Sequence, residues 1–261
     1  MGTKLSLTRI GEGLTMDFDY IEQGDCLELM KQIPDGSIDM ILTDPPYGIK
    51  YRSNHRTKSK SFDVLTNDNT DIRLVTYPEC FRILKDNSVC IVFASWKNVA
   101  DDIVELRKYF DIKNVIVWWK HSGGLGDLKH TLSTDYELAI VCHKGKAPIR
   151  GKRNGSVWEC KKVNPNSMVH PTQKPEELCK RFIETFSDEG CVIFDPFMGS
   201  GSTCVAAVNT GRHYIGFELD PQYFEIARQR LGEDALTVPT RKRTREFTPS
   251  ASCNAKIDEE E

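Results

Sequence analysis

Short apolar runs alternate with amphipathic segments along most of the chain. Each run is bounded by turn-forming residues and therefore indicates a buried strand, whereas the segments between runs carry apolar residues at helical spacing. The expected strands cover 38–42, 89–93, 115–119, 136–142, 191–194 and 213–217. The expected helices cover 27–33, 76–84, 97–109, 176–186, 205–208 and 223–231. This alternation predicts an α/β fold with a mostly parallel sheet and helices on both faces.

The two ends of the chain lack this pattern. Residues before about 24 are poorly patterned, and from Gly232 onward the chain becomes polar, with TRKRTRE and a terminal DEEE. Polar segments with few apolar residues bury too little surface to fold alone. We therefore expect one folded domain over 1–235 and a disordered tail over 236–261.

The composition favours a protein of the reducing cytoplasm. With 261 residues the chain can bury a hydrophobic core without disulfide bonds. No apolar run is long enough to cross a bilayer. Its nine cysteines form no CxxC pair, and several lie inside apolar runs. This usage differs from a disulfide framework and from a zinc site. We expect buried thiols, no metal centre, no membrane association and a cytoplasmic location.

The net charge of −3 conceals two basic blocks. The stretches KYRSNHRTKSK at 50–60 and KGKAPIRGKR at 144–153 each hold five Lys or Arg and no acid. Basic loops are often only solubilising, but two blocks that flank one candidate site favour a polyanionic partner. The candidate phosphate or base contacts are Lys50, Arg52, Arg56, Arg150, Lys152 and Arg153.

The stretch TDPPYG at 43–48 directly follows the first expected strand. Prolines cannot continue a strand, and each one restricts both itself and the residue before it. Asp44, Pro45, Pro46 and Tyr47 therefore present a carboxylate, a carbonyl and an aromatic ring in a nearly rigid arrangement. A strand-ending turn would explain Asp44 and Gly48, but it leaves the doubled proline and the tyrosine unexplained.

A later strand ends in the glycine-bearing turn FDPFMGSGST at 194–203, and Glu218 ends the strand after it. This succession is the unit by which α/β proteins bind nucleotides at the carboxyl ends of strands. A dinucleotide fingerprint needs a third glycine where Cys204 stands, and a P-loop needs a lysine after the glycines. A nucleoside ligand without pyrophosphate, such as S-adenosylmethionine, fits better. The alternative is that the glycines only allow a helix to pack closely on the sheet.

Six motifs in this order resemble the β group of amino-methylating DNA methyltransferases. They are GDC at 24–26, DPPYG at 44–48, YELAIVCHKG at 136–145, HPTQKP at 170–175, FDPFMGSGST at 194–203 and GFELD at 216–220. The resemblance covers about 17–232. It implies a Rossmann-like, S-adenosylmethionine-dependent methyltransferase fold for the domain at 1–235.

The resemblance also implies a set of cofactor residues. The glycine turn would pass under the methionine part of S-adenosylmethionine, and Glu218 would hold the ribose. Asp25 would lie near the adenine, and Lys174 near the carboxylate. The full expected set is Asp25, Lys174, Phe194, Asp195, Pro196, Phe197, Gly199, Gly201, Thr203 and Glu218.

By the same resemblance, TDPPYG has a catalytic role. An exocyclic amine of a nucleobase is a poor nucleophile because its lone pair is delocalised into the ring. Asp44 and the Pro45 carbonyl would accept its two N–H bonds, Pro46 would restrain them, and Tyr47 would stack on the base. Since the amine is unreachable inside a duplex, the base is expected to flip out.

Adenine N6 and cytosine N4 present the same amine chemistry. In the resembling family an acid at the first motif position accompanies adenine more often, and a serine accompanies cytosine, so Asp44 favours adenine. The alternatives are N4 methylation of cytosine and an inactive homologue that binds nucleic acid without methyl transfer. Glutamine methylation usually accompanies Asn in place of this Asp and ranks below both.

Target recognition is expected in the short segment at about 146–169, because this part of the resembling family reads double-stranded DNA. The segment is too short for an independent domain, so recognition must be compact and the site short. The sequence leaves open the recognition sequence, a homodimer and a cognate restriction endonuclease.

Overall fold

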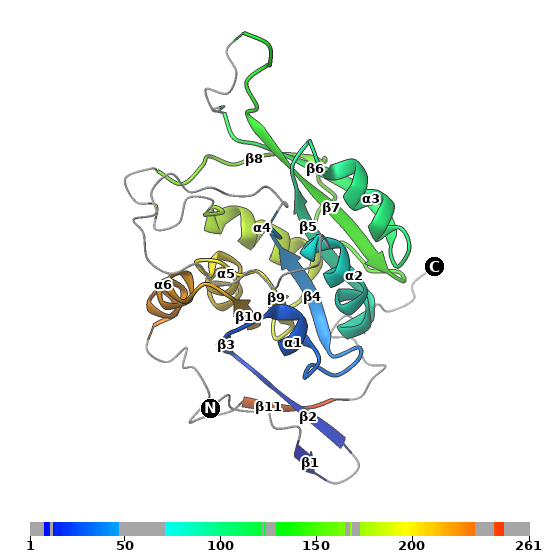
Figure 1. Ribbon diagram of the computed structural model, residues 1–261. Coiled ribbons are helices and arrows are strands. Elements are labelled where there is room, and N and C mark those ends of the chain that lie inside the picture. Colours follow the sequence, from blue (N-terminus) through cyan, green and yellow to red (C-terminus); the bar gives the residue numbers. More distant parts are fainter. Residues whose placement is uncertain are drawn as a thin grey trace.

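The computed structural model describes residues 8–10, 13–46, 71–121, 123, 129–164, 168, 173–232 and 243–247 (Figure 1). Of the residues singled out above, Tyr47, Lys50, Arg52 and Arg56 lie outside these ranges. Within the described ranges, no helix combines the length and apolar character needed to cross a membrane. The same ranges hold no cluster of three or more His, Cys, Asp or Glu that could hold a metal ion.

Most of the described strands form one eight-stranded sheet. In spatial order they are β3 (Tyr20–Gln23), β10 (His213–Glu218), β9 (Val192–Asp195), β4 (Ile38–Thr43), β5 (Leu84–Ala94), β7 (Tyr136–Lys144), β6 (Asp111–Trp119) and β8 (Val157–Glu159). Only β7 pairs antiparallel with its neighbours β5 and β6; the other neighbouring strands are parallel. The expected α/β fold with a mostly parallel sheet is confirmed.

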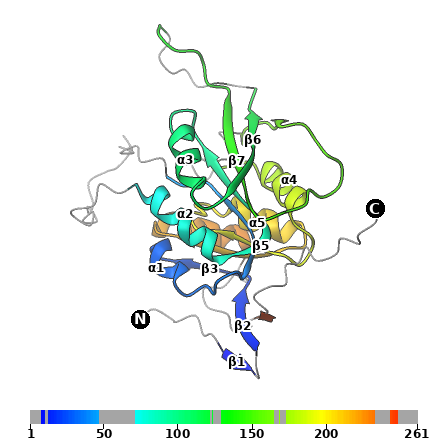
Figure 2. The same ribbon diagram turned by 90° about the vertical axis from the view of Figure 1, so that its right-hand side faces the viewer.

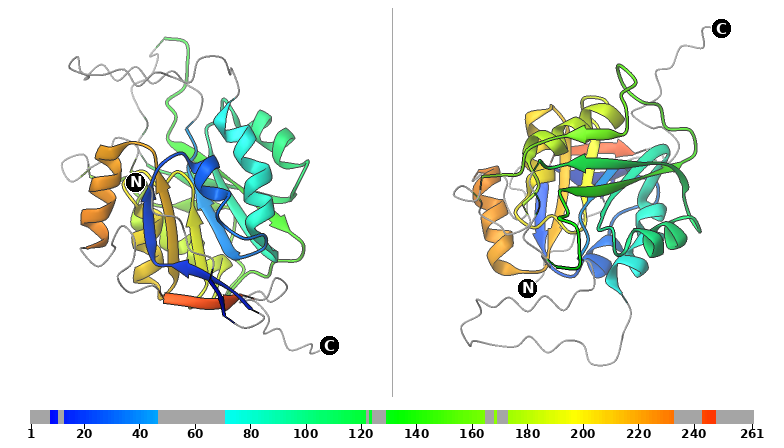
Figure 3. Two further views of the ribbon diagram at one scale, coloured as in Figure 1. Left: turned by 60° about the horizontal axis from the view of Figure 1, so that its bottom comes forward. Right: turned by 90° about the horizontal axis from the view of Figure 1, so that it is seen from above.

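Helices cover both faces of the sheet, as the views in Figures 2 and 3 show. One face carries α1 (Cys26–Met30), α2 (Ile72–Ile83) and α3 (Val99–Leu106). The opposite face carries α4 (Glu176–Phe186), α5 (Ser202–Asn209) and α6 (Pro221–Leu231). The central strands therefore contribute to two cores, which explains why they are apolar without clear alternation.

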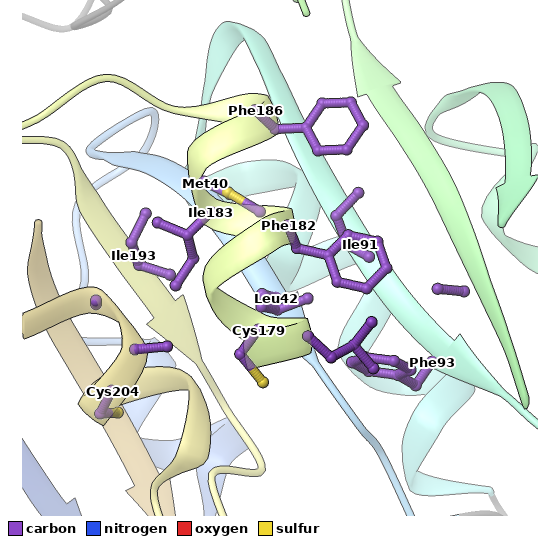
Figure 4. Packing of buried hydrophobic residues seen from close by; sticks show 14 of the residues in the cluster. Met40, Leu42, Ile91, Phe93, Cys179, Phe182, Ile183, Phe186, Ile193 and Cys204 are labelled. Carbon is purple, nitrogen blue, oxygen red and sulfur yellow. The ribbon is translucent and has the colours of Figure 1, made fainter. Parts of the chain in front are cut away.

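Strand β4 illustrates how one run supplies both cores. All six of its residues are buried. Met40 and Leu42 point to the α4 side, where they pack near Phe182 and Ile183 (Figure 4). Ile41 faces the other way, into the cluster beneath α1 and α2. Burial on both faces holds β4 rigidly, and the chain leaves its carboxyl end at Asp44.

The described part of the tail, residues 243–247, forms a strand, which differs from the disorder expected over 236–261. β11 (Arg243–Phe247) pairs antiparallel with β2 (Gly13–Phe18), which also pairs with β1 (Thr8–Ile10). Composition indicates whether a segment can fold by itself, but it does not show a partner strand that lies more than two hundred residues earlier. Pairing with β2 provides hydrogen-bond partners for backbone N–H and C=O groups of β11, which an isolated strand cannot satisfy by itself.

Several elements extend beyond the apolar runs that predicted them. β6 begins at Asp111 and β5 at Leu84, because both continue to pair with β7 or β4 where their side chains become polar. α2 begins at Ile72, where the Asp71 carboxylate accepts a hydrogen bond from the Arg73 backbone N–H. The short strands β3 and β8 were not predicted, since their runs are too brief to show a period.

The carboxyl ends of β4, β5, β6, β9 and β10 meet at one edge of the sheet because these strands share one direction. β7 runs the opposite way and therefore begins at that edge (Figure 1). Crevices at the carboxyl ends of strands are where α/β proteins bind their ligands. The expected catalytic and cofactor residues gather here.

Candidate active site

The turn after β9 depends on one carboxylate, which accepts a backbone hydrogen bond, and on glycines, which have no side chain. Asp195 ends β9, and its Oδ1 accepts a hydrogen bond from the Phe197 backbone N–H at 3.1 Å. Gly199 and Gly201 have φ of 52° and 78°, a region that L side chains rarely adopt. A Cβ on Gly201 would lie 3.1 Å from the Cβ of Ala227 in α6. The glycines therefore serve both the turn and the packing of helices.

Glu218 ends β10 and closes the turn from the other side. Its Oε2 accepts a hydrogen bond from the Gly199 N–H at 2.9 Å, and its Oε1 accepts one from the Asp220 N–H at 2.8 Å. Burial raises the pKa of Glu218 above its ordinary value, although these two donors act against it. Each carboxylate oxygen has a second lone pair, so Glu218 can accept further hydrogen bonds from a ligand.

Asp25 is held next to the end of β10. The Gly24 N–H donates to the Glu218 carbonyl at 3.0 Å, so the end of β3 adjoins the end of β10. The Asp25 side chain caps α1 by accepting the Leu27 N–H at 2.8 Å. Its position beside Glu218 is consistent with the expected cofactor pocket, and its contact with adenine stays a prediction.

Two members of the expected cofactor set are deeply buried. Phe194 is fully buried, and its ring packs edge-on against Phe217 at 5.1 Å between centroids. Its side chain thus belongs to the core beneath α1 and α2 and not to the wall of a pocket, which corrects the expectation for this residue. Burial raises the pKa of Asp195 to about 7, and the nearby Asp44 charge adds to the rise.

Three further members of the expected cofactor set, Pro196, Phe197 and Thr203, lie along the same turn. Pro196 is buried and Phe197 is half-buried. The Thr203 hydroxyl lies 3.4 Å from the Leu42 carbonyl of β4, so the start of α5 is placed against the strand that carries the catalytic segment. The turn therefore lies directly beside Asp44.

The catalytic segment begins where β4 ends. Asp44 is half-buried, Pro45 is buried and Pro46 is exposed. The Lys174 ammonium donates to Asp44 Oδ2 at 2.6 Å. The chain reaches Tyr47 one residue after the described part, so its expected stacking on a base stays a prediction.

Lys174 forms two ion pairs that the resemblance did not imply. Its ammonium lies between Asp44 and Glu137, 3.0 Å from Glu137 Oε2. Burial alone would lower the pKa of Lys174, but the two carboxylates outweigh it and raise that pKa. An ammonium has three donors, so a contact with a cofactor carboxylate stays a prediction beside these two ion pairs.

Sequence reasoning missed Glu137 and Lys120. Glu137 lies at the start of β7, and its Oε1 pairs with the Lys120 ammonium at 3.0 Å. An acid in the apolar run YELAIV was a visible signal, since a buried acid needs a partner. The identity of that partner depends on strand order, which the sequence did not show.

Arg150 differs from its expected role in DNA contact. Its guanidinium forms a bidentate pair with Asp188, at 2.7 and 2.9 Å. Asp188 precedes β9, whereas Asp195 ends it, so Arg150 lies at the opposite end of the sheet from Asp44. Lys152 and Arg153 are exposed and remain the candidates for contact with phosphates.

We expect the double variant Lys152→Ala, Arg153→Ala to bind DNA more weakly and with a shallower salt dependence. Loss of two phosphate contacts would reduce the slope of log K against log salt by about 2. Fluorescence anisotropy with a labelled duplex over a salt series measures both quantities. Arg150→Ala is the matched variant, and its main effect should be a lower melting temperature. Equal salt slopes for the wild type and the double variant would contradict the assignment.

Comparison with known proteins identifies the family. A family model described as DNA methylase matches residues 38–229, which is well over half of the chain and includes both turns. The chain belongs to the DNA methylase family. The methylase is 30% identical over 269 residues to the DNA adenine methyltransferase YhdJ of Escherichia coli strain K12, which covers 88% of this chain and 87% of the relative.

Two solved structures share the fold of the methylase. The complex of M1.HpyAVI with SAM superposes with a TM-score of 0.65 at 24% identity and covers 82% of this chain and 98% of that chain. The cytosine-N4-specific PvuII DNA methyltransferase superposes with a TM-score of 0.66 at 18% identity and covers 85% of this chain and 91% of that chain. The methylase is therefore an amino-methyltransferase of DNA with the fold expected from its motifs.

Proposed function

We propose that this methylase transfers a methyl group from S-adenosylmethionine to the N6 amine of adenine in double-stranded DNA. The observation that supports it best is the Asp44 carboxylate, held at the end of β4 beside the glycine turn. An acid at this motif position accompanies adenine methylation more often than cytosine methylation in the family. The 30% sequence identity to a DNA adenine methyltransferase of Escherichia coli also favours adenine.

The residues at the strand ends fit S-adenosylmethionine. The cofactor supplies a methyl group made electrophilic by a positively charged sulfur. Glu218 places an acidic group beside the turn, which suits a cationic ligand, and Asp195 adds a polar side chain at the end of β9. Glu218 has acceptor capacity left for ribose hydroxyls after its two backbone hydrogen bonds.

Asp44 and the Pro45 carbonyl prepare the amine for transfer. When both accept its N–H bonds, the nitrogen pyramidalises and its lone pair turns away from the ring. The amine nitrogen then forms a bond to the methyl carbon as the bond between sulfur and carbon breaks. The electron pair of the broken bond would stay on sulfur, which becomes neutral. Positive charge would develop on nitrogen, where the nearby carboxylate would stabilise it until one amine proton passes to solvent. Oriented acceptors in a rigid segment account for the rate without a covalent intermediate.

Access to the base requires two further steps that we propose from the family resemblance. The adenine flips out of the duplex, and Tyr47 stacks on it. We place the reaction in the cytoplasm, where the cysteine thiols of the described part, most of them buried, would stay reduced.

The nucleoside product tests the proposal directly. We expect tritium from labelled S-adenosylmethionine to appear in N6-methyladenine after incubation with unmethylated duplex DNA, digestion to nucleosides and chromatography. Label in N4-methylcytosine would instead identify the enzyme as a cytosine methyltransferase. Cofactor binding by calorimetry without label in any base would identify an inactive homologue.

A further inference from the structure

A row of four alternating charges leads away from Asp44 at the edge of the sheet. Asp44 Oδ2 lies 2.6 Å from the Lys174 ammonium, which lies 3.0 Å from Glu137 Oε2. Glu137 Oε1 lies 3.0 Å from the Lys120 ammonium. The four residues come from the end of β4, the approach to α4, the start of β7 and the end of β6. Four separate segments thus contribute to one row of charges, with Asp44 at its end.

The inner members of this row are shielded from water. Lys174 is 8% exposed, and its ammonium lies 4.8 Å from the centroid of the Phe93 ring. The Oε2 atom of Glu137 is buried. Burial alone would raise the pKa of Glu137, but the two lysines outweigh it and lower that pKa, so this side chain is ionised at neutral pH. Screening by solvent is weak for such charges, so their mutual effects are large.

Stability alone does not explain this arrangement. Buried ion pairs are weak evidence for stability, because desolvation offsets much of their attraction. The sheet shows a simpler arrangement at its other end, where Lys85 pairs with Asp39 at 2.7 Å near the start of β4. That pair lies toward the start of β4, whereas the row through Lys174 reaches Asp44 at its carboxyl end.

We propose that Glu137 is a positioning residue for methyl transfer, which holds Lys174 against Asp44 and neutralises the charge of Lys174. The inference rests on the proposed function, since it concerns the same amine and the same carboxylate. Lys120 has the supporting role of holding the second oxygen of Glu137. Within the described part of the chain, we assign this positioning role to Glu137 alone.

The need for Glu137 follows from the charge that develops during transfer. Positive charge grows on the amine nitrogen next to Asp44, and an uncompensated ammonium bonded to the same carboxylate would oppose it. Glu137 places a negative charge on the far side of Lys174, so Lys174 orients Asp44 without opposing the reaction. With Asp44 Oδ2 held by Lys174, the orientation of the carboxylate toward the base is set before substrate arrives.

The test is the single-turnover rate of Glu137→Gln with duplex DNA and S-adenosylmethionine. We expect the rate to fall about 10²-fold, as for a misplaced catalytic group, while KM for DNA and the calorimetric cofactor affinity change by only a few-fold. Glu137→Asp keeps the charge and should recover most of the rate. The double variant Glu137→Gln, Lys174→Met should be no slower than Lys174→Met alone, because Glu137 acts through Lys174.

Asp39→Asn is the matched control, since it breaks a buried ion pair of the same sheet far from Asp44. It should lower the melting temperature and leave the single-turnover rate unchanged. A rate for Glu137→Gln within about threefold of wild type would overturn the inference alone, and so would an equal slowing by Asp39→Asn. A wild-type enzyme that methylates no base in DNA would overturn the proposed function, and this inference with it.

Discussion

Replacing Asp44 with alanine lowers the single-turnover rate of methyl transfer by about 10³-fold or more, with cofactor affinity within a few-fold of wild type. The variant removes the acceptor for the amine and the partner of the Lys174 ammonium. Lys174 keeps its ion pair with Glu137, so the site loses a catalytic group without leaving that ammonium unpaired. Rapid-quench assays with labelled cofactor measure the rate, and calorimetry measures the affinity.

The variant Asp44→Asn distinguishes the effect of the side chain's shape on the rate from the effect of its charge. The amide keeps the size of the side chain and one oxygen acceptor, but it cannot offer a negative charge to the nitrogen. We expect a rate between those of wild type and Asp44→Ala. An Asp44→Ala enzyme that transfers methyl groups at the wild-type rate would refute the assignment of the catalytic segment.

Replacing Glu218 with alanine, or Gly199 with valine, weakens binding of S-adenosylmethionine for two different reasons. Glu218→Ala removes the expected ribose acceptor, and hydrogen bonds to a charged group contribute about 1.5–3 kcal/mol each, so the loss should be at least about tenfold. Gly199→Val forces a β-branched side chain into a backbone with φ of 52°. The Gly199 N–H also donates to Glu218, so both changes act on one turn. Isothermal titration calorimetry measures both losses.

The raised pKa of Glu218 adds a dependence on pH. The ionised carboxylate is the stronger acceptor for ribose hydroxyls, and burial raises its pKa above the ordinary value. Wild-type affinity should therefore fall as the pH drops through that raised value, whereas the affinity of Glu218→Gln should respond less. Unchanged affinity in both Glu218→Ala and Gly199→Val would show that the cofactor binds elsewhere.

The strands and the nature of their ends could be predicted from the sequence. The run at 38–42 and the prolines after it act within a few residues, so the end of β4 at Asp44 follows from local preferences. The same holds for Asp195 at the end of β9 and for Glu218 at the end of β10. Parallel strands then bring these three acids to one edge, which is why the motifs predicted the location of the site.

Tertiary structure decided which charges meet. The sequence shows Lys174, Glu137 and Arg150 as polar residues in separate segments, with no indication of their partners. The antiparallel insertion of β7 places Glu137 at the carboxyl edge, beside Lys174 and Lys120. The path after β7 places Arg150 on Asp188, at the far end of the sheet from the expected DNA contact.

The same distinction between local and tertiary effects explains why the sequence did not show the burial of Phe194 or the strand in the tail. The motif FDPF indicates a turn, but only the packing of β9 between two layers shows that Phe194 points into the core. β11 is a strand because β2 lies beside it, which no composition of 236–261 could show. Propensity and periodicity act over neighbouring residues and therefore determine elements and their ends. Ion pairs, core side chains and edge pairings depend on strand order and register, which form only when distant segments pack together.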